Sequence, residues 1–139
     1  MISSGPLEDR LALRELVESY NDAVMRFDAD DWGANWVDDG IWSLPGMGEV
    51  AGKANIVELW KKATGSYEVG GFFASAGPIV VDGDTATGTW YQQEFLKTGD
   101  GVERTGPDPH AAEVEGRVRH ARKLAGPGYG LDSSRLRIA

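Results

Sequence analysis

The sequence predicts an α+β domain in which helices come first and an antiparallel sheet follows. Apolar residues recur at helical spacing through the first half, whereas β-branched and aromatic residues alternate with period two after Gly65. A chain of 139 residues suffices for one domain with a buried core, and it shows no internal repeat or linker. We therefore expect a single domain over residues 1–124 and a Gly-rich, flexible tail over residues 125–139.

The helical half contains three expected helices. Residues 7–27 carry an apolar stripe at every third or fourth position: Leu13, Leu16, Val17, Tyr20, Val24 and Phe27. A polar break follows, where Asp28 either caps a short helix bearing Trp32 and Trp36 or serves as a catalytic carboxylate. A third helix, residues 53–63, presents Ile56, Leu59 and Trp60 on one face. Tryptophans so dense between helix and strand suggest the wall of an apolar cavity as well as a core.

The strands are expected mainly in the second half. A short strand contains Trp42, and residues 72–81 and 85–96 form a hairpin, because the Asp-Gly step in VDGD is typical of a tight turn. Another strand should begin near Val102. The Pro-Asp-Pro segment at 107–109 must interrupt it, since proline cannot donate a ladder hydrogen bond, and residues 114–124 resume it with a turn around Gly116.

Composition narrows the possible partners and chemistry. The net charge is −8, which disfavours nucleic acid and acidic membrane surfaces as partners, so a small molecule or a protein is expected instead. The chain has no cysteine, and no apolar run approaches the roughly 20 residues of a membrane span. Two histidines without clustered carboxylates predict neither a metal site nor a cofactor. Without a signal-peptide pattern at the N-terminus, we expect a cytoplasmic protein.

Four segments together resemble the SnoaL-like branch of the nuclear transport factor 2-like superfamily. They are a first helix of the form RxALxxLxxxY and the stretches DDWGANWVDDGIWSLPGMGEVAGKANI, VVDGDTATGTWYQQE and EVEGRVRHARK. The resemblance spans about residues 8–124. It implies a cone, in which a curved antiparallel sheet is wrapped by three helices around an apolar pocket. Within that branch the chain is similar to scytalone dehydratase and hexachlorocyclohexane dehydrochlorinase, and more remotely to ketosteroid isomerase and limonene epoxide hydrolase.

The resemblance also indicates which catalytic groups are missing. The dehydratases and dehydrochlorinases of this branch pair an Asp on the first helix with a His on the first long strand to remove a proton next to a leaving group. Here those positions fall on Met25 and Gly71. The family's pocket tryptophan is matched by Trp42 and its basic residue on the last strand by Arg122, whereas His120 stands where a packed aromatic is usual and is expected to have no catalytic role.

Strand alternation divides the second strand of the hairpin into two faces. Trp90, Gln92 and Glu94 share one face, and a second set lies on the other: Tyr91, Gln93 and Phe95. The resemblance implies that the first set lines the pocket, while parity alone leaves Glu94 either inside or as a solvated surface charge. It also implies that Tyr20 and Asn21 line the pocket; for Tyr20 a core position with a satisfied hydroxyl is the alternative.

Two functions remain open from sequence. One is a pocket that binds a small apolar molecule, lined by Asn21, Met25, Trp42, Trp90, Gln92 and Arg122, with or without an unassigned reaction. The other is a cofactor-independent lyase, isomerase or hydrolase in which Glu94, Tyr20 or Asp28 supplies acid or base. The resemblance further implies a homodimer formed through the outer sheet face of Tyr91, Gln93 and Phe95.

Overall fold

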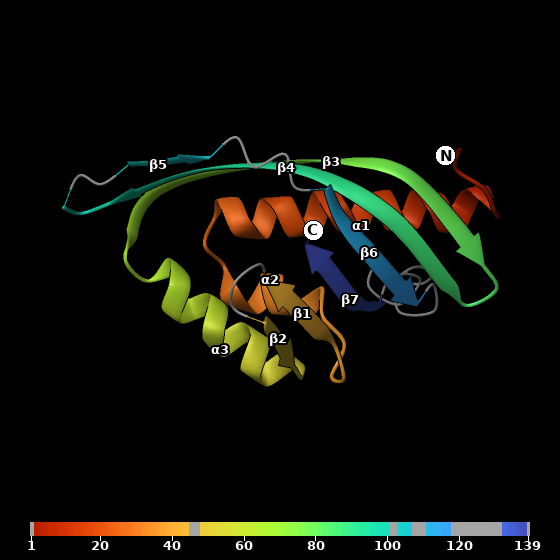
Figure 1. Cartoon of the computed structure of the whole chain (residues 1–139), viewed down its shortest axis with the longest axis horizontal. Coiled ribbons are helices and arrows are strands. Elements are labelled where there is room, and N and C mark those ends of the chain that lie inside the picture. Colours follow the sequence, from red (N-terminus) through yellow and green to blue (C-terminus); the bar gives the residue numbers. More distant parts are fainter. Residues whose placement is uncertain (1, 45–47, 101–102, 107–110, 118–131, 139) are drawn as a thin grey trace.

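The computed structural model describes residues 2–44, 48–100, 103–106, 111–117 and 132–138 (Figure 1). Helices and short strands come first and long strands follow, as the α+β prediction requires. The helices are α1 (Leu7–Met25), α2 (Ala29–Ala34) and α3 (Lys53–Thr64). The strands are β1 (Ile41–Leu44), β2 (Gly48–Ala51), β3 (Tyr67–Asp82), β4 (Thr85–Thr98), β5 (Glu103–Gly106), β6 (Ala111–Arg117) and β7 (Asp132–Ile138).

The strands form one seven-stranded sheet in the order β2-β1-β7-β6-β4-β3, with β5 paired to β4. Among the described strand pairs, β1 and β7 run parallel and the others run antiparallel. The expectation of a wholly antiparallel sheet is therefore wrong at one pair. Most of the chain separates β1 from β7, so no hairpin forces the two strands to run in opposite directions.

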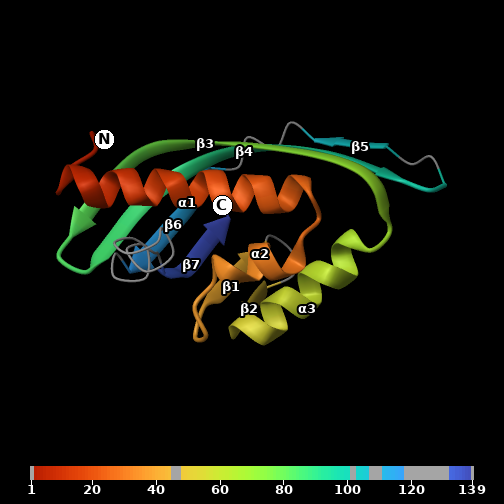
Figure 2. The ribbon, with the colours of Figure 1, turned by 180° about the vertical axis from the view of Figure 1, so that it is seen from behind.

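The β3–β4 hairpin arches over α1 (Figures 1 and 2). Gly83 closes its turn with a φ of 59°, a left-handed conformation that glycine adopts without a steric penalty. The register shifts between Tyr67 and Val69 and again between Ala76 and Ile79. Such irregularities bend a strand, which accounts for the arch. The first strand of the hairpin, β3, begins at Tyr67, five residues before the expected start. The hairpin itself is confirmed.

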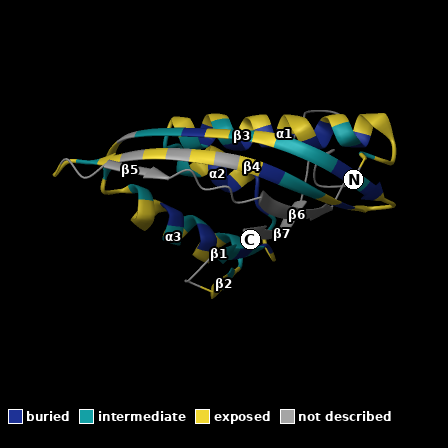
Figure 3. Ribbon diagram, turned by 45° about the horizontal axis from the view of Figure 1, so that its top comes forward, coloured by how far each residue is buried: buried dark blue, intermediate teal, exposed yellow. Residues whose placement is uncertain are grey.

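α1 packs along the concave side of this arch (Figure 2). Its predicted stripe is confirmed: Leu13, Leu16, Val17 and Tyr20 are buried, and Val24 and Phe27 pack partly buried against the core. Other side chains of α1, including Leu7 and Leu11, remain exposed. Figure 3 shows the resulting contrast between the inner and outer sides of the helix. In α3, Ile56 and Trp60 are buried as expected.

The two faces of the arch differ sharply in exposure. On β3, Phe72 is 5% exposed and its neighbour Phe73 is 60% exposed. On β4, Trp90 is buried, whereas Tyr91 is exposed. The predicted alternation on β4 is therefore confirmed at these positions, with Trp90 inside and Tyr91 outside.

The C-terminal third differs from the sequence expectation in two ways. β6 runs through Gly116, which pairs with Ala86, so the expected turn there is wrong. Residues 132–138, expected to belong to a flexible tail, form β7 between β1 and β6. The missed signal is the alternation of Leu136 and Ile138 with two arginines, which follows a Gly-rich stretch. The Pro-Asp-Pro segment, His110 and His120 lie outside the described residues.

Candidate functional site

Seven buried aromatic residues form a continuous cluster beneath the arch, which we call the aromatic cluster. α1 contributes Tyr20, α2 and its C-terminal end contribute two tryptophans, and single residues come from β1, α3, β3 and β4. Its members are Tyr20, Trp32, Trp36, Trp42, Trp60, Phe72 and Trp90. The sequence predicts that Trp36, Trp42 and Trp90 contribute to the core or cavity wall, and their core positions are confirmed.

Tyr20 joins the sheet side of this cluster to the tryptophan side. Its ring centroid lies 5.2 Å from that of Trp90, 5.8 Å from that of Phe72 and 5.7 Å from that of Trp32. The first of these pairs is edge-to-face, an arrangement that the aromatic quadrupole favours. Tyr20 is 8% exposed, so it is a core residue as well as a member of the site region.

Trp32 is the centre of the tryptophan side. Its ring stacks on that of Trp60 with centroids 4.8 Å apart and planes inclined by 14°. The rings of Trp36 and Trp42 each lie 5.5 Å from that of Trp32 and 6.1 Å from each other, and all three are tilted relative to one another. Three indoles therefore form a compact triangle.

This region holds four buried polar atoms that lack a hydrogen-bond partner among the described residues. Three are indole nitrogens, on Trp32, Trp36 and Trp42, and the fourth is Oδ1 of Asn21. The Asn21 Nδ2 donates to the Ala74 carbonyl at 3.1 Å, which ties α1 to β3 and leaves Oδ1 as a fixed acceptor. A buried polar atom without a partner costs about 1–3 kcal/mol, so such atoms call for an explanation.

The two positions at which the resemblance places a catalytic dyad carry neither an acid nor an imidazole. Met25, which is 43% exposed, lies at the end of α1, and its Sδ accepts a 3.0 Å hydrogen bond from the Phe72 backbone N–H. A Cβ at Gly71 would lie 3.6 Å from ring atoms of both Phe73 and Phe95, which belong to the outer face of the arch. The residue of β3 that reaches Met25 is thus Phe72.

Asp28 is engaged as a helix cap, which confirms the capping interpretation. Its Oδ1 accepts from the backbone N–H groups of Asp30 and Asp31 at 3.1 and 2.9 Å, and its Oδ2 accepts from Arg26 at 2.9 Å. The Asp31 N–H bond, followed by the Arg26 contact, holds the pKa of Asp28 below its ordinary value. Both oxygens are occupied and the group stays charged, so Asp28 is poorly suited to act as an acid or base.

The remaining candidates are placed only in part. The side chains of Gln92 and Glu94, and all of Arg122, lie outside the described residues. The backbone register is described: Glu94 pairs with Phe72, and Gln92 pairs with Ala74. Opposed residues of an antiparallel pair share a face, and Phe72 belongs to the aromatic cluster. The register is thus compatible with the predicted inward side of β4, and the orientation of Glu94 stays a prediction.

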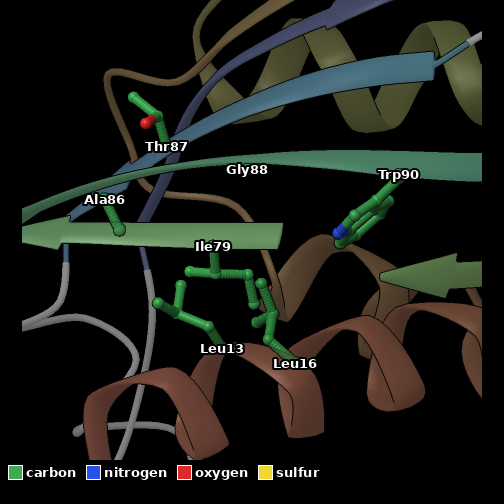
Figure 4. A pocket seen from close by; sticks show the side chains of 7 residues that line it. All are labelled: Leu13, Leu16, Ile79, Ala86, Thr87, Gly88 and Trp90. Atoms are coloured by element: carbon green, nitrogen blue, oxygen red, sulfur yellow. The ribbon is translucent and has the colours of Figure 1, made fainter. Parts of the chain in front are cut away.

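Described residues line a small hollow and a larger groove. The smaller, of about 20 Å³, lies between α1 and the sheet, with Trp90 at one end (Figure 4). Its volume suits about one water molecule. The larger is an open groove of about 480 Å³ between α2 and α3, lined by Ala29, Asp30, Gly33, Asp38, Lys53, Ala54, Val57, Glu58 and Lys61. It mixes both signs of charge and contains none of the predicted site residues.

Four members of the aromatic cluster are not among the predicted site residues: Trp32, Trp36, Trp60 and Phe72. The sequence indicates a cavity wall near Trp32 and Trp36, which are helix aromatics four residues apart, and gives no such indication for Phe72. The spacing of the two tryptophans is an available signal. Their unpartnered nitrogens are not, because hydrogen bonding depends on tertiary contacts that a single sequence does not show.

The part of the chain that the structure describes contains no group of three or more His, Cys, Asp or Glu side chains that could hold a metal ion. None of the helices in this portion is long and apolar enough to cross a bilayer.

Comparison with known proteins identifies the family. The family model described as the SnoaL-like domain matches residues 5–122. The chain belongs to this family. Its strand β7 lies beyond the match yet is part of the sheet, so the structural domain extends further than the family model.

Solved structures agree on the fold. A proposed aromatic ring hydroxylase from Novosphingobium aromaticivorans has a TM-score of 0.79 at 24% identity, covering 95% of this chain and 88% of that one. An NTF2-like protein with a cystatin-like fold from the same species has a TM-score of 0.70 at 27% identity, covering 93% and 79%. A proposed dehydratase of the NTF2-like family from Streptomyces avermitilis has a TM-score of 0.70 at 17% identity, covering 91% and 93%. The predicted superfamily and α+β cone are confirmed.

Proposed function

We propose that this SnoaL-like domain binds a small organic molecule against the aromatic cluster beneath the β3–β4 arch. The supporting observation is the cluster itself, in which six aromatic residues come from six different elements and a seventh, Trp36, follows α2. Three of its indole nitrogens and the nearby Asn21 Oδ1 are buried without a partner among the described residues. Ligand sites in proteins are mostly apolar, with a few fixed polar groups that orient the ligand. The cluster supplies the apolar surface, and Asn21 Oδ1 supplies one oriented acceptor.

The residues at the dyad positions favour binding over the elimination reaction of the family's dehydratases and dehydrochlorinases. A thioether and a glycine cannot remove a proton, and the Met25 sulfur already accepts a hydrogen bond from Phe72. We therefore expect no hexachlorocyclohexane dehydrochlorinase or scytalone dehydratase activity. Gln92 and Arg122 are proposed to complete the ligand-binding set with Met25, Trp42 and Trp90.

A second candidate function is proton transfer by Glu94. The observation that favours it is the register of Glu94 with Phe72, whose ring contacts Tyr20 inside the aromatic cluster. A carboxyl group facing such surroundings would lose solvation, which disfavours its charged form and raises its pKa. Ketosteroid isomerase uses such tuning, because one of its carboxylic acids stays neutral in an apolar site. Glu94 would then exchange protons close to neutral pH.

The test of both candidates is a carboxyl NMR titration of Glu94 combined with ligand binding by Glu94→Gln. The matched control is Glu68→Gln, because Glu68 is an exposed residue of the same hairpin. A Glu94 pKa clearly above the ordinary value of about 4.3, with weakened binding in Glu94→Gln, would support proton transfer. An ordinary Glu94 pKa and unchanged ligand binding in Glu94→Gln would assign Glu94 to the surface. Ligand binding would then be the remaining candidate function.

For the assembly, we propose a homodimer formed through the outer face of the arch. Phe73, Tyr91 and Phe95 are 60%, 57% and 39% exposed. The rings of Phe73 and Phe95 are edge-to-face with centroids 6.3 Å apart, so they form one patch. Contiguous exposed apolar surface is uncommon on monomers and often marks an interface.

A further inference from the structure

We propose that the molecule bound by the aromatic cluster carries a hydrogen-bond-accepting oxygen, such as a ketone carbonyl, and that indole N–H groups recognise it. This inference rests on the proposed binding function and narrows its ligand class. The sequence predicts a small apolar molecule, whereas the inferred ligand also carries an oxygen that accepts hydrogen bonds.

The chemistry of the three unpartnered groups supports this choice. The indole N–H of tryptophan can donate a hydrogen bond and cannot accept one. Trp32, Trp36 and Trp42 are 0%, 1% and 8% exposed, and each nitrogen lacks a partner among the described residues. A ligand that offers only donors, such as an ammonium group, would leave these N–H groups unpaired, whereas a carbonyl oxygen has two lone pairs to accept them.

The three indole rings that carry these donors belong to one packed group. The ring centroids of Trp32, Trp36 and Trp42 lie within 6.1 Å of one another. Their nitrogens are enclosed by packed atoms, so an arriving oxygen must displace part of that packing. Trp42 is the least buried of the three and lies on the short strand β1. We therefore assign the first contact with the ligand oxygen to Trp42.

Two other tryptophans provide controls. Trp60 stacks on Trp32, and Trp90 lies against Tyr20, yet neither belongs to the set of unpartnered nitrogens. The chain has five tryptophans, so a protein labelled with ¹⁵N at tryptophan gives five indole N–H signals. The Trp60 and Trp90 signals report ligand binding that involves no hydrogen bond to the indole nitrogen.

The experiment compares two probes of nearly equal shape, acetophenone and α-methylstyrene, which differ in having C=O or C=CH₂. Their dissociation constants are measured by NMR titration for wild type, Trp42→Phe and Trp60→Phe. The ratio of the two constants within each protein is then compared between proteins, which cancels the different water solubilities of the probes. Acetophenone should lose about tenfold in affinity relative to α-methylstyrene in Trp42→Phe, and the ratio should stay unchanged in Trp60→Phe.

The wild-type spectrum gives a second measurement that does not depend on a variant folding. Acetophenone should move the Trp42 indole proton downfield, and α-methylstyrene should not. If both probes bind while the ratio and the indole signals stay unchanged, the oxygen-acceptor inference is wrong and the binding function stands. If neither probe binds at millimolar concentration, the proposed binding function fails for ligands of this size, and the inference fails with it.

Discussion

Phe72 and Phe73 are adjacent on β3 and lie on opposite faces of the arch, so their replacement by alanine tests the inner and outer assignment. Phe72 is 5% exposed and packs 5.8 Å from the Tyr20 ring, whereas Phe73 is 60% exposed. A phenylalanine side chain has an accessible surface of about 200 Å², so Phe72 buries roughly 100 Å² more than Phe73. At about 25 cal/mol per Å², this extra burial stabilises the fold by about 2.5 kcal/mol.

The cavity left inside adds to the loss at the inner position. We expect Phe72→Ala to lower the free energy of unfolding by about 3–5 kcal/mol and Phe73→Ala by less than about 1 kcal/mol in the monomer. Urea denaturation, fitted for both midpoint and slope, measures the two values. It should be repeated over a range of protein concentrations, because a dimer formed through the outer face would make only the Phe73→Ala loss depend on concentration. Equal losses at every concentration would refute the assignment of faces.

Three further predictions address assembly, the helix cap and helix packing. Light scattering of the wild type should give twice the 15.0 kDa chain mass, and Tyr91→Glu should reduce it to one chain; a wild-type monomer at micromolar concentration would contradict the dimer. The Asp31 N–H and Arg26 lower the Asp28 pKa from its ordinary value of 3.8. The charged Asp28 side chain therefore contributes its full stabilisation above that value, and the stabilisation is lost as pH falls through the lower pKa of the folded state. Thermal unfolding at decreasing pH should show a weaker acid dependence in Asp28→Asn and a wild-type dependence in Asp30→Asn. A Cβ at Gly33 would lie 2.9 Å from Val57 Cγ2, so Gly33→Ala should cost about 1–3 kcal/mol in urea unfolding, whereas Gly88→Ala, with its nearest contacts at 3.4 Å, should cost nothing measurable.

The sequence was sufficient to predict the helices, the long hairpin and the division of β4 into two faces, whereas the inward side at Trp90 came from the family resemblance. Each depends on a local pattern: a 3.6-residue stripe in α1, an Asp-Gly turn at Gly83, and period-two alternation in β4. Asp28 was also predictable as a cap, because its position before a short helix determines which backbone N–H groups it can reach.

Sequence alone could not predict features that depend on contacts between distant segments. Strand β7 fills the sheet between β1 and β6, and its parallel pairing with β1 leaves no local signature. The Met25 sulfur accepts a hydrogen bond from a backbone N–H of β3. The identity of residue 25 does not predict this contact. The unpartnered indole nitrogens are likewise a property of how distant elements pack.

The most direct test of a ligand site inside the arch is measurement of intermolecular nuclear Overhauser effects between bound acetophenone and the protein. Binding at the aromatic cluster predicts contacts from the ligand to ring protons of Tyr20, Trp42 and Trp90. Contacts confined to Phe73, Tyr91 and Phe95 on the outer face would contradict it.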